Sequence, residues 1–188
     1  MRTKRIKSVY LVTSNENKIK EFEEILGFEL KHINLELDEI QSVDVKKVVE
    51  HKAKQAFNKV KKPVIVEDSG LYFEAWNGLP GALAKQFDET IGYRKLCRLL
   101  KTNRRAKAET VVGYYDGKNY LSFSGEIWGR ISLEPKGKTG FGWDVIFIPK
   151  GYNRTFAQLG NEKNKISMRK IALKKLREFL KKINNDSL

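Results

Sequence analysis

VYLVTSNENKIKEFEEILG, residues 9–27, joins a short apolar run to an amphipathic pattern that has the period of a helix. Val9–Thr13 predicts a buried strand, because the run is short, apolar and rich in β-branched residues. Asn15–Leu26 predicts a helix with Ser14 or Asn15 as its N-cap and Gly27 as its end. A strand followed at once by a helix is typical of α/β proteins, and the N-terminus of such a helix is suited to binding phosphate.

Strand and helix patterns alternate in the first half of the chain, and consecutive strands follow in the second half. Further helices are expected at 45–60, at 88–100 with Asp88 as its N-cap, and at 167–183. Strands are expected within 28–37 and at 63–67, 108–115, 120–124, 127–133 and 143–148, with a hairpin turn at Asp116-Gly117. The order predicts one α/β domain over residues 1–188, with helices packed on a mixed sheet and room for two lobes around a cleft.

The net charge of the chain indicates which kinds of molecule the protein could bind. The formal net charge is +14, from 37 Lys and Arg against 23 Asp and Glu, so an anionic partner is expected: nucleic acid or a small phosphate ester. The alternative is a lysine-rich surface of the kind found in proteins from hot environments. Lysine pairs at 46–47, 61–62, 174–175 and 181–182 favour solvated helix faces over one patch.

Several kinds of site and location are disfavoured. The single cysteine, Cys97, leaves no intramolecular disulfide and no cysteine-rich zinc site, and two histidines are few for a histidine metal site. Any metal should therefore be a hard cation held by carboxylates. No apolar run approaches the roughly 20 residues of a membrane span. The basic segment Met1–Lys7 precedes an apolar run too short for a signal peptide, so a cytoplasmic location is expected.

Three cations occupy positions that a helix does not favour. Lys52 falls inside the apolar stripe of the helix at 45–60, and Arg169 falls on the apolar side of the last helix, in its first turn. If Asn15 is the N-cap, Lys18 stands at the third position of the first helix, where an acid is preferred. A cleft that binds an anion would explain all three positions. Snorkelling to solvent would explain the position of Lys52 as well, and a carboxylate elsewhere in the chain would explain that of Arg169.

Two acidic positions are candidates for binding a metal. Asp68 lies in Glu67-Asp68-Ser69-Gly70, which is expected to follow a short strand and to form a turn at the edge of the sheet. Glu39 follows Asp38 at the end of another strand-like segment. Magnesium usually takes one or two carboxylates, with waters and substrate phosphates as its other ligands. Glu67 should point to the opposite side of the strand from Asp68, which gives it a lesser role; a plain Asx turn is the alternative for Asp68.

The segment TGFGWD, residues 139–144, has glycines on both sides of Phe141. Such a turn can expose an aromatic ring, and an exposed ring can stack on a purine base. The alternative is a β-bulge whose aromatic residues belong to the core.

Together these segments resemble the inosine triphosphate pyrophosphatases, also called non-standard purine nucleoside triphosphate pyrophosphatases, from about residue 9 to about residue 183. The matching motifs, in order, are TSNENKIKE at 13–21, VEDSGL at 66–71, GLPGA at 78–82, FGWD at 141–144, TFAQL at 155–159 and EKNKISMR at 162–169. Each motif alone is unspecific, and their order and spacing make the resemblance strong.

The resemblance implies an elongated mixed sheet, two lobes around a nucleotide cleft, a homodimer, and hydrolysis of ITP, dITP or XTP to monophosphate and pyrophosphate. It implies that Mg²⁺, with Mn²⁺ as a possible replacement, is held by Glu39 and Asp68, and that Asp68 accepts a proton. Asp68, Lys18 and Lys52 would be the catalytic residues. The implied substrate-binding residues are Thr13, Ser14, Asn15, Lys18, Lys52, Ser69, Phe141, Gly142, Trp143, Asp144, Lys163, Met168 and Arg169.

One residue departs from the family pattern, which has Ser-His-Arg where this chain has Ser167-Met168-Arg169. A methionine side chain is not a hydrogen-bond donor to a purine carbonyl. The selectivity for the base is therefore less firmly implied than the reaction. A pyrophosphatase for pyrimidine or modified nucleotides and a basic nucleic-acid-binding protein stay as alternatives. Against the second, the basic residues are dispersed and no recognised nucleic-acid-binding signature occurs.

Overall fold

The computed structural model describes residues 9–185, and the basic segment at 1–7 lies outside this range. The first unit is the expected one: strand β1 (Tyr10–Val12) leads into helix α1 (Glu16–Leu26). Asn15 is the N-cap, since its side chain accepts hydrogen bonds from the backbone N–H groups of Asn17 and Lys18. Gly27 ends the helix in the left-handed conformation, which glycine adopts without steric cost.

Within residues 9–185, seven strands form one mixed sheet, which confirms the predicted fold class. The order is β2-β1-β3-β5-β6-β7, with β4 paired to β3 beside this path. Strands β2, β1 and β3 are parallel, and the others pair antiparallel. The bounds are β2 Lys31–Ile33, β3 Val64–Phe73, β4 Pro80–Gly81, β5 Arg105–Tyr115, β6 Tyr120–Ile131 and β7 Phe147–Pro149.

Strand β3 has a gap along one edge. On that edge β1 pairs with Val64 and Ile65, and β4 pairs with Leu71 and Tyr72. Residues 66–70 between them have no strand partner on that edge among the described residues, while β5 pairs with the other edge along the whole strand. The predicted end of the strand at 67 and the predicted turn after it are therefore wrong. The acidic segment lies in the middle of a long strand, in a notch between β1 and β4.

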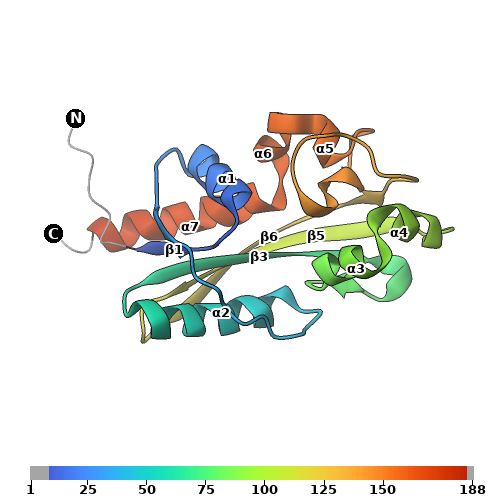
Figure 1. The fold of residues 1–188 in the computed structure, drawn as a ribbon. Coiled ribbons are helices and arrows are strands. Elements are labelled where there is room, and N and C mark those ends of the chain that lie inside the picture. The colour runs from blue at the N-terminus through green and yellow to red at the C-terminus, as the bar shows by residue number, and fades with distance from the viewer. Residues whose placement is uncertain (1–8, 186–188) are drawn as a thin grey trace.

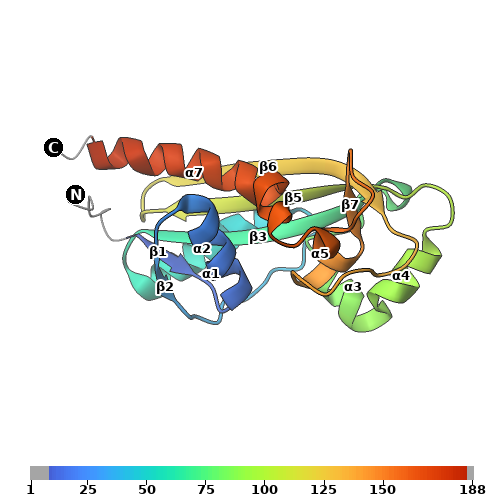
Figure 2. The same cartoon turned by 90° about the horizontal axis from the view of Figure 1, so that it is seen from above.

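Helices cover both faces of the sheet (Figures 1 and 2). Helix α1, the short helix α6 (Lys163–Ile166) and the long helix α7 (Met168–Asn185) lie on one face, and α2 (Val45–Val60) lies on the other. Leu11, Phe22, Ile65 and Leu176 belong to the core under α1 and α7. Val49, Ala53 and Val111 belong to the core under α2. The expected helix at 45–60 has the predicted bounds.

The far end of the sheet carries the remaining short elements. They are η1 (Glu74–Trp76), α3 (Ala84–Ile91), α4 (Tyr93–Leu99), η2 (Gly142–Val145), α5 (Phe156–Leu159) and η3 (Gly160–Glu162). The single helix expected at 88–100 is wrong, because Gly92 with a φ of 79° separates two helices. Asp88 lies inside α3, where its carboxylate accepts a hydrogen bond from the backbone N–H of Tyr93 instead of capping a helix that begins at 88.

Strand β4 packs the far end of the sheet against the start of α2. Gly81 has a φ of 58°, and a Cβ there would stand 2.3 Å from the carbonyl oxygen of Val43, one residue before the N-cap of α2. The backbone N–H of Ala82 donates to the same carbonyl at 3.0 Å. Only a glycine permits this close approach without strain. No helix between residues 9 and 185 has both the length and the apolar character needed to cross a bilayer.

Candidate functional site

A cleft of about 680 Å³ opens at the notch in β3, between the helices of the sheet faces and the elements at the far end. Its volume is in the range of small-molecule sites. The structure brings every residue proposed from the sequence to this one cleft: Thr13, Ser14, Asn15, Lys18, Glu39, Lys52, Asp68, Ser69, Phe141, Gly142, Trp143, Asp144, Lys163, Met168 and Arg169.

The β1–α1 connection supplies one wall. The side-chain oxygen of Thr13 accepts a hydrogen bond from the backbone N–H of Asn15 at 3.1 Å, which fixes the turn into the helix. Lys18 Nζ reaches across to β3, where it lies 3.1 Å from Glu67 Oε2 and 3.8 Å from Asp68 Oδ1. The first turn of α1 therefore lines the cleft and contributes a lysine to it, with the backbone N–H groups of Asn17 and Lys18 capped by the Asn15 side chain.

Lys52 links α2 to two carboxylates. Its Nζ lies 2.5 Å from Glu39 Oε1 and 2.7 Å from Asp68 Oδ2, and the residue is 8% exposed. Burial lowers the pKa of this ammonium, but Asp68 and Glu39 outweigh burial and hold the pKa above its ordinary value. The lysine predicted to lie in the apolar stripe is therefore buried and compensated, and it does not snorkel to solvent.

Glu39 is held in position by the same helix. The expectation that Asp38 and Glu39 end a strand is wrong, because β2 ends at Ile33 and the following segment has no regular structure until α2. The backbone N–H of Asp38 donates to Gln55 Oε1 at 2.7 Å, and Gln55 Nε2 donates to Asp38 Oδ2 at 2.6 Å. This reciprocal pair fixes the residue that precedes Glu39.

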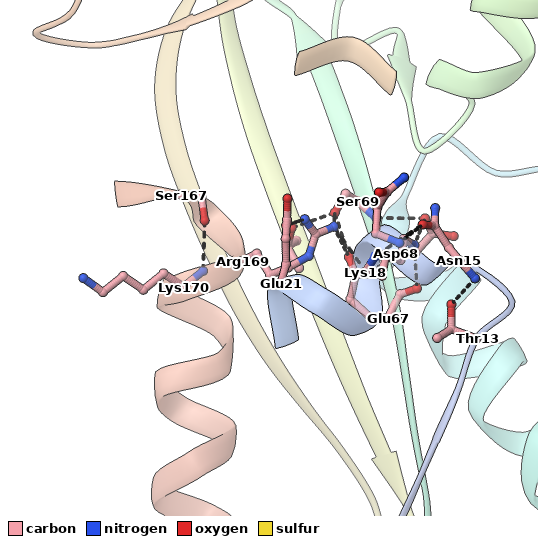
Figure 3. A network of polar contacts seen from close by, with 12 residues as sticks. Thr13, Asn15, Lys18, Glu21, Glu67, Asp68, Ser69, Ser167, Arg169 and Lys170 are labelled. Carbon is pink, nitrogen blue, oxygen red and sulfur yellow. Dashed lines mark hydrogen bonds and ion pairs between the residues drawn. The ribbon is translucent and has the colours of Figure 1, made fainter. Parts of the chain in front are cut away.

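A buried network centres on Arg169, in the first turn of α7 (Figure 3). One Nη donates to Glu21 on α1, and the other lies 3.2 Å from Glu67 Oε1 and 3.3 Å from the Ser69 hydroxyl. Burial raises the pKa of Glu67, but Arg169 and Lys18 dominate and lower it to about 2. The Nε of Arg169 is buried and has no hydrogen-bond partner among the described residues.

Lys163 forms a second buried centre beside the first. Its Nζ lies 2.7 Å from Glu21 Oε1 and 2.7 Å from Asp144 Oδ2, and 4.8 Å from the centre of the Phe141 ring. Burial raises the pKa of Asp144, and Lys163 offsets part of that rise. Asp144 also accepts the backbone N–H of Phe141 at 2.9 Å, so one carboxylate holds both the turn and the lysine.

The turn at 139–144 presents Phe141 to the cleft and does not form the β-bulge given as the alternative. The 3₁₀ helix η2 (Gly142–Val145) begins within it, so the strand predicted at 143–148 is wrong over 143–146 and correct only at 147–148. Gly140 has a φ of 73°, and a Cβ there would stand 2.3 Å from Asp144 Oδ2. Phe141 is half-buried at the cleft, whereas Trp143 packs against Phe147 in the core.

Two acidic residues matter more than the sequence indicated. Glu67 does point to the opposite face from Asp68, as predicted, but it contacts both Lys18 and Arg169 there. Glu21 is the last residue of the TSNENKIKE motif, and the sequence predicts no role for it. In the structure it contacts Lys163 and Arg169. A glutamate three residues after Lys18 on the buried face of α1 was the signal. The opposite wall, which includes Ala82, Lys85, Asp88 and Tyr93, had no comparable signal.

The four cations predicted to lie in the site are all matched by carboxylates. Four cations (Lys18, Lys52, Lys163 and Arg169) contact five acids (Glu21, Glu39, Glu67, Asp68 and Asp144). A carboxylate facing Arg169, one of the two explanations for its position, is therefore present, and the lysines have carboxylate partners as well.

Metal binding must rest on few protein ligands. Within residues 9–185 no three His, Cys, Asp or Glu side chains gather into a group that could hold a metal ion. Glu39 and Asp68, however, direct one oxygen each at the same ammonium nitrogen, so both oxygens already converge on a single cation position. Two carboxylates fit a hard divalent cation that completes its shell with water and phosphate oxygens.

The fold and the cleft define the class: a mixed α/β protein with a nucleotide-sized cleft in which cations and converging carboxylates face one another. The chain belongs to the Ham1 family, whose family model matches residues 9–179.

Its relatives cover nearly the whole chain. The dITP/XTP pyrophosphatase of Methanopyrus kandleri is 42% identical over 180 residues, which are 92% of this chain and 96% of that protein. The inosine triphosphate pyrophosphatase of Schizosaccharomyces pombe is 39% identical over 187 residues, 96% of this chain and 98% of that protein. The structure of a HAM1 protein from Coxiella burnetii has a TM-score of 0.81 at 29% identity and covers 93% of this chain and 98% of its own.

Proposed function

We propose that this chain is a nucleoside triphosphate pyrophosphatase that hydrolyses non-standard purine nucleotides, ITP, dITP and XTP, to monophosphate and pyrophosphate. The observation that carries the proposal is the cleft itself, where Glu39 and Asp68 converge on one cation position beside the N-terminus of α1. The names of its relatives support the same activity. Removal of these nucleotides keeps non-standard bases out of the nucleotide pool.

The phosphate chain is assigned to the end of the cleft formed by β1 and α1. There the positive end of the α1 dipole favours an anion, with Thr13, Ser14 and Asn15 shaping the turn. Lys18 and Lys52 add fixed positive charge at the half-buried cleft, where charge stabilises a transition state more strongly than in water. A phosphate oxygen can join the partners of these lysines or replace one of their carboxylates, because an ammonium has three N–H donors.

The metal site is assigned to Glu39 and Asp68, with Mg²⁺ as the expected ion and Mn²⁺ as a possible replacement. When bound, such an ion offsets the charge that builds up on the phosphate oxygens. Asp68 is assigned a second role as the group that orients a water molecule and accepts its proton. The oxygen of that water forms a bond to the α phosphorus. The bond from the α phosphorus to the oxygen that bridges the α and β phosphates breaks, and pyrophosphate leaves.

The base is assigned to the end of the cleft formed by 141–144, Lys163 and Arg169, with Phe141 stacking on the purine. Ser69 lies between the two ends and donates to Glu67 at 2.7 Å. Arg169 is assigned as the donor to the 6-keto oxygen, because its guanidinium lies beside Phe141 at the wall of the cleft. Adenine presents the reverse donor and acceptor pattern. Met168 is buried and adds packing at this end.

Three further assignments follow from the family resemblance. We infer that the chain is one domain whose two lobes border the cleft, that it forms a homodimer, and that it acts in the cytoplasm. Neither nucleic acid nor membrane is expected as a partner. Light scattering of the purified protein tests the dimer.

The identity of the products tests the reaction. Phosphorus NMR of a reaction with ITP is expected to show inosine monophosphate and pyrophosphate as the first products. Inosine diphosphate and inorganic phosphate as first products would refute the assigned bond cleavage, although the cleft would still be a nucleotide site. Retention of duplex or single-stranded nucleic acid with strong salt dependence, without hydrolysis, would favour the nucleic-acid-binding alternative.

A further inference from the structure

Lys52 occupies the position that the proposed metal would take. Its Nζ lies 2.5 Å from Glu39 Oε1 and 2.7 Å from Asp68 Oδ2, so one ammonium nitrogen holds the inner oxygens of both carboxylates. The two acids come from separate elements, the segment before α2 and the middle of β3. Lys52 is therefore the group that brings these two carboxylates to one point.

An ammonium and a divalent metal cannot share that point. Magnesium stands about 2.0–2.1 Å from its oxygen ligands, and two cations that close to the same pair of oxygens would overlap and repel each other strongly. A metal that takes the same two oxygens, Glu39 Oε1 and Asp68 Oδ2, must therefore displace the Lys52 ammonium. Lys18 competes less directly, because it lies 3.8 Å from Asp68 Oδ1 and its nearer partner is Glu67 at 3.1 Å.

We propose that Lys52 is an internal counter-cation that a divalent metal must displace, and that the displaced ammonium becomes available to bind the phosphate chain. The metal replaces the Lys52 ammonium at the two carboxylates. The phosphates replace the carboxylates as the partners of the Lys52 ammonium. Each ligand thus removes an obstacle to the other, and the coupling is reciprocal: the nucleotide raises metal affinity by the factor by which the metal raises nucleotide affinity. This inference rests on the proposed metal site at Glu39 and Asp68.

The protein without nucleotide should therefore bind a divalent metal weakly, because the positive charge of Lys52 opposes the metal. The test is titration of the full-length, nucleotide-free protein with Mn²⁺, followed by electron paramagnetic resonance of the free ion. Lys52→Gln removes the charge and is expected to bind Mn²⁺ at least about tenfold more tightly than the wild type. Lys52→Arg keeps the charge and should bind as weakly as the wild type.

Two further variants separate the possible failures. Lys54→Gln removes an exposed lysine of the same helix, paired with Glu50, and controls for net charge. Asp68→Asn removes a proposed metal ligand. Equal affinity in wild type and Lys52→Gln, sensitive to Asp68→Asn in both, would overturn the inference and leave the metal site intact. Binding that Asp68→Asn leaves unchanged in every background would overturn the metal site, and the inference with it.

A measurement on the wild type alone does not depend on how the variants fold. Mass spectrometry after brief acylation of the lysine amines compares Lys52 with Lys54, with and without saturating Mn²⁺. The displaced Lys52 amine is expected to be labelled more with Mn²⁺ present, while the labelling of Lys54 stays constant. Unchanged or reduced labelling of Lys52 at saturating Mn²⁺ would contradict the displacement.

Discussion

Replacing Arg169 by methionine should lower the free energy of unfolding more than replacing any exposed arginine does. Arg169 is 1% exposed, and it contacts Glu21, Glu67 and Ser69. Methionine has a similar length but no charge, so Arg169→Met leaves Glu67 buried without its main counter-ion. Removing one partner of a buried ion pair costs about 3–5 kcal/mol. For a chain of this size, that loss lowers the melting temperature by roughly 6–20 °C.

Equilibrium unfolding in urea at neutral pH measures the loss, and two companion variants locate its cause. Arg169→Met combined with Glu67→Gln should recover part of the lost stability, because the uncompensated carboxylate is gone. Arg154→Met breaks an exposed pair with Glu162 and should cost less than about 1 kcal/mol. A loss below about 1 kcal/mol for Arg169→Met, or no recovery in the double variant, would refute the buried network as a source of stability.

Three further predictions concern the acids of the cleft and their support. Asp68→Asn should lower turnover by about 10²-fold or more with an unchanged circular dichroism spectrum, since it loses the proton acceptor, and near-normal turnover would remove that role. Gln55→Ala removes the hydrogen bonds to Asp38 and should raise the Mg²⁺ concentration needed for half-maximal activity, with the rate at saturating Mg²⁺ nearly unchanged. An unaltered Mg²⁺ requirement would show that the segment holds Glu39 without Gln55. Stability should fall as pH drops from about 4.5 to about 2, because the pKa of Glu67 is lowered from 4.5 to about 2 by folding, and urea midpoints across this window should change less in Glu67→Gln.

The fold class and the family could be predicted from the sequence because their signals are local. The apolar period at 45–60 gave the bounds of α2, and Asn15 and Gly27 mark the ends of α1. The order of short motifs indicated the family, and the match to the Ham1 family model and relatives named as dITP/XTP and inosine triphosphate pyrophosphatases confirm it. The lysine pairs predicted to be solvated are exposed.

The course of β3 could not be predicted in the same way. Glu67-Asp68-Ser69-Gly70 has the composition of a turn, because buried acids in a central strand are costly when unpaired. Their compensation comes from Lys18, Lys52 and Arg169, which are distant in the sequence and reach the strand only after the chain has folded. The same reason hides the role of Glu21, whose partners lie more than 140 positions along the chain.

The break between α3 and α4 also depends on more than composition. The apolar pattern of 88–100 continues through Gly92, so the period alone predicts one helix. The positive φ of Gly92 ends the first helix, and the hydrogen bond from Tyr93 to Asp88 fixes the turn into the second. An internal glycine in a helical pattern is a weak signal by itself, since many helices tolerate one.

Release of pyrophosphate from a panel of nucleotides tests the proposed function most directly. ITP, XTP, dITP, ATP, GTP and UTP are compared with Mg²⁺ and with a chelator. We expect metal-dependent release that favours ITP, XTP and dITP over ATP, by a factor that can reach about 10⁴ when a site pairs with a polar group of its substrate. Release mainly from UTP would overturn the substrate, and no release from any nucleotide across a range of temperatures would contradict the assignment of this cleft as a pyrophosphatase site.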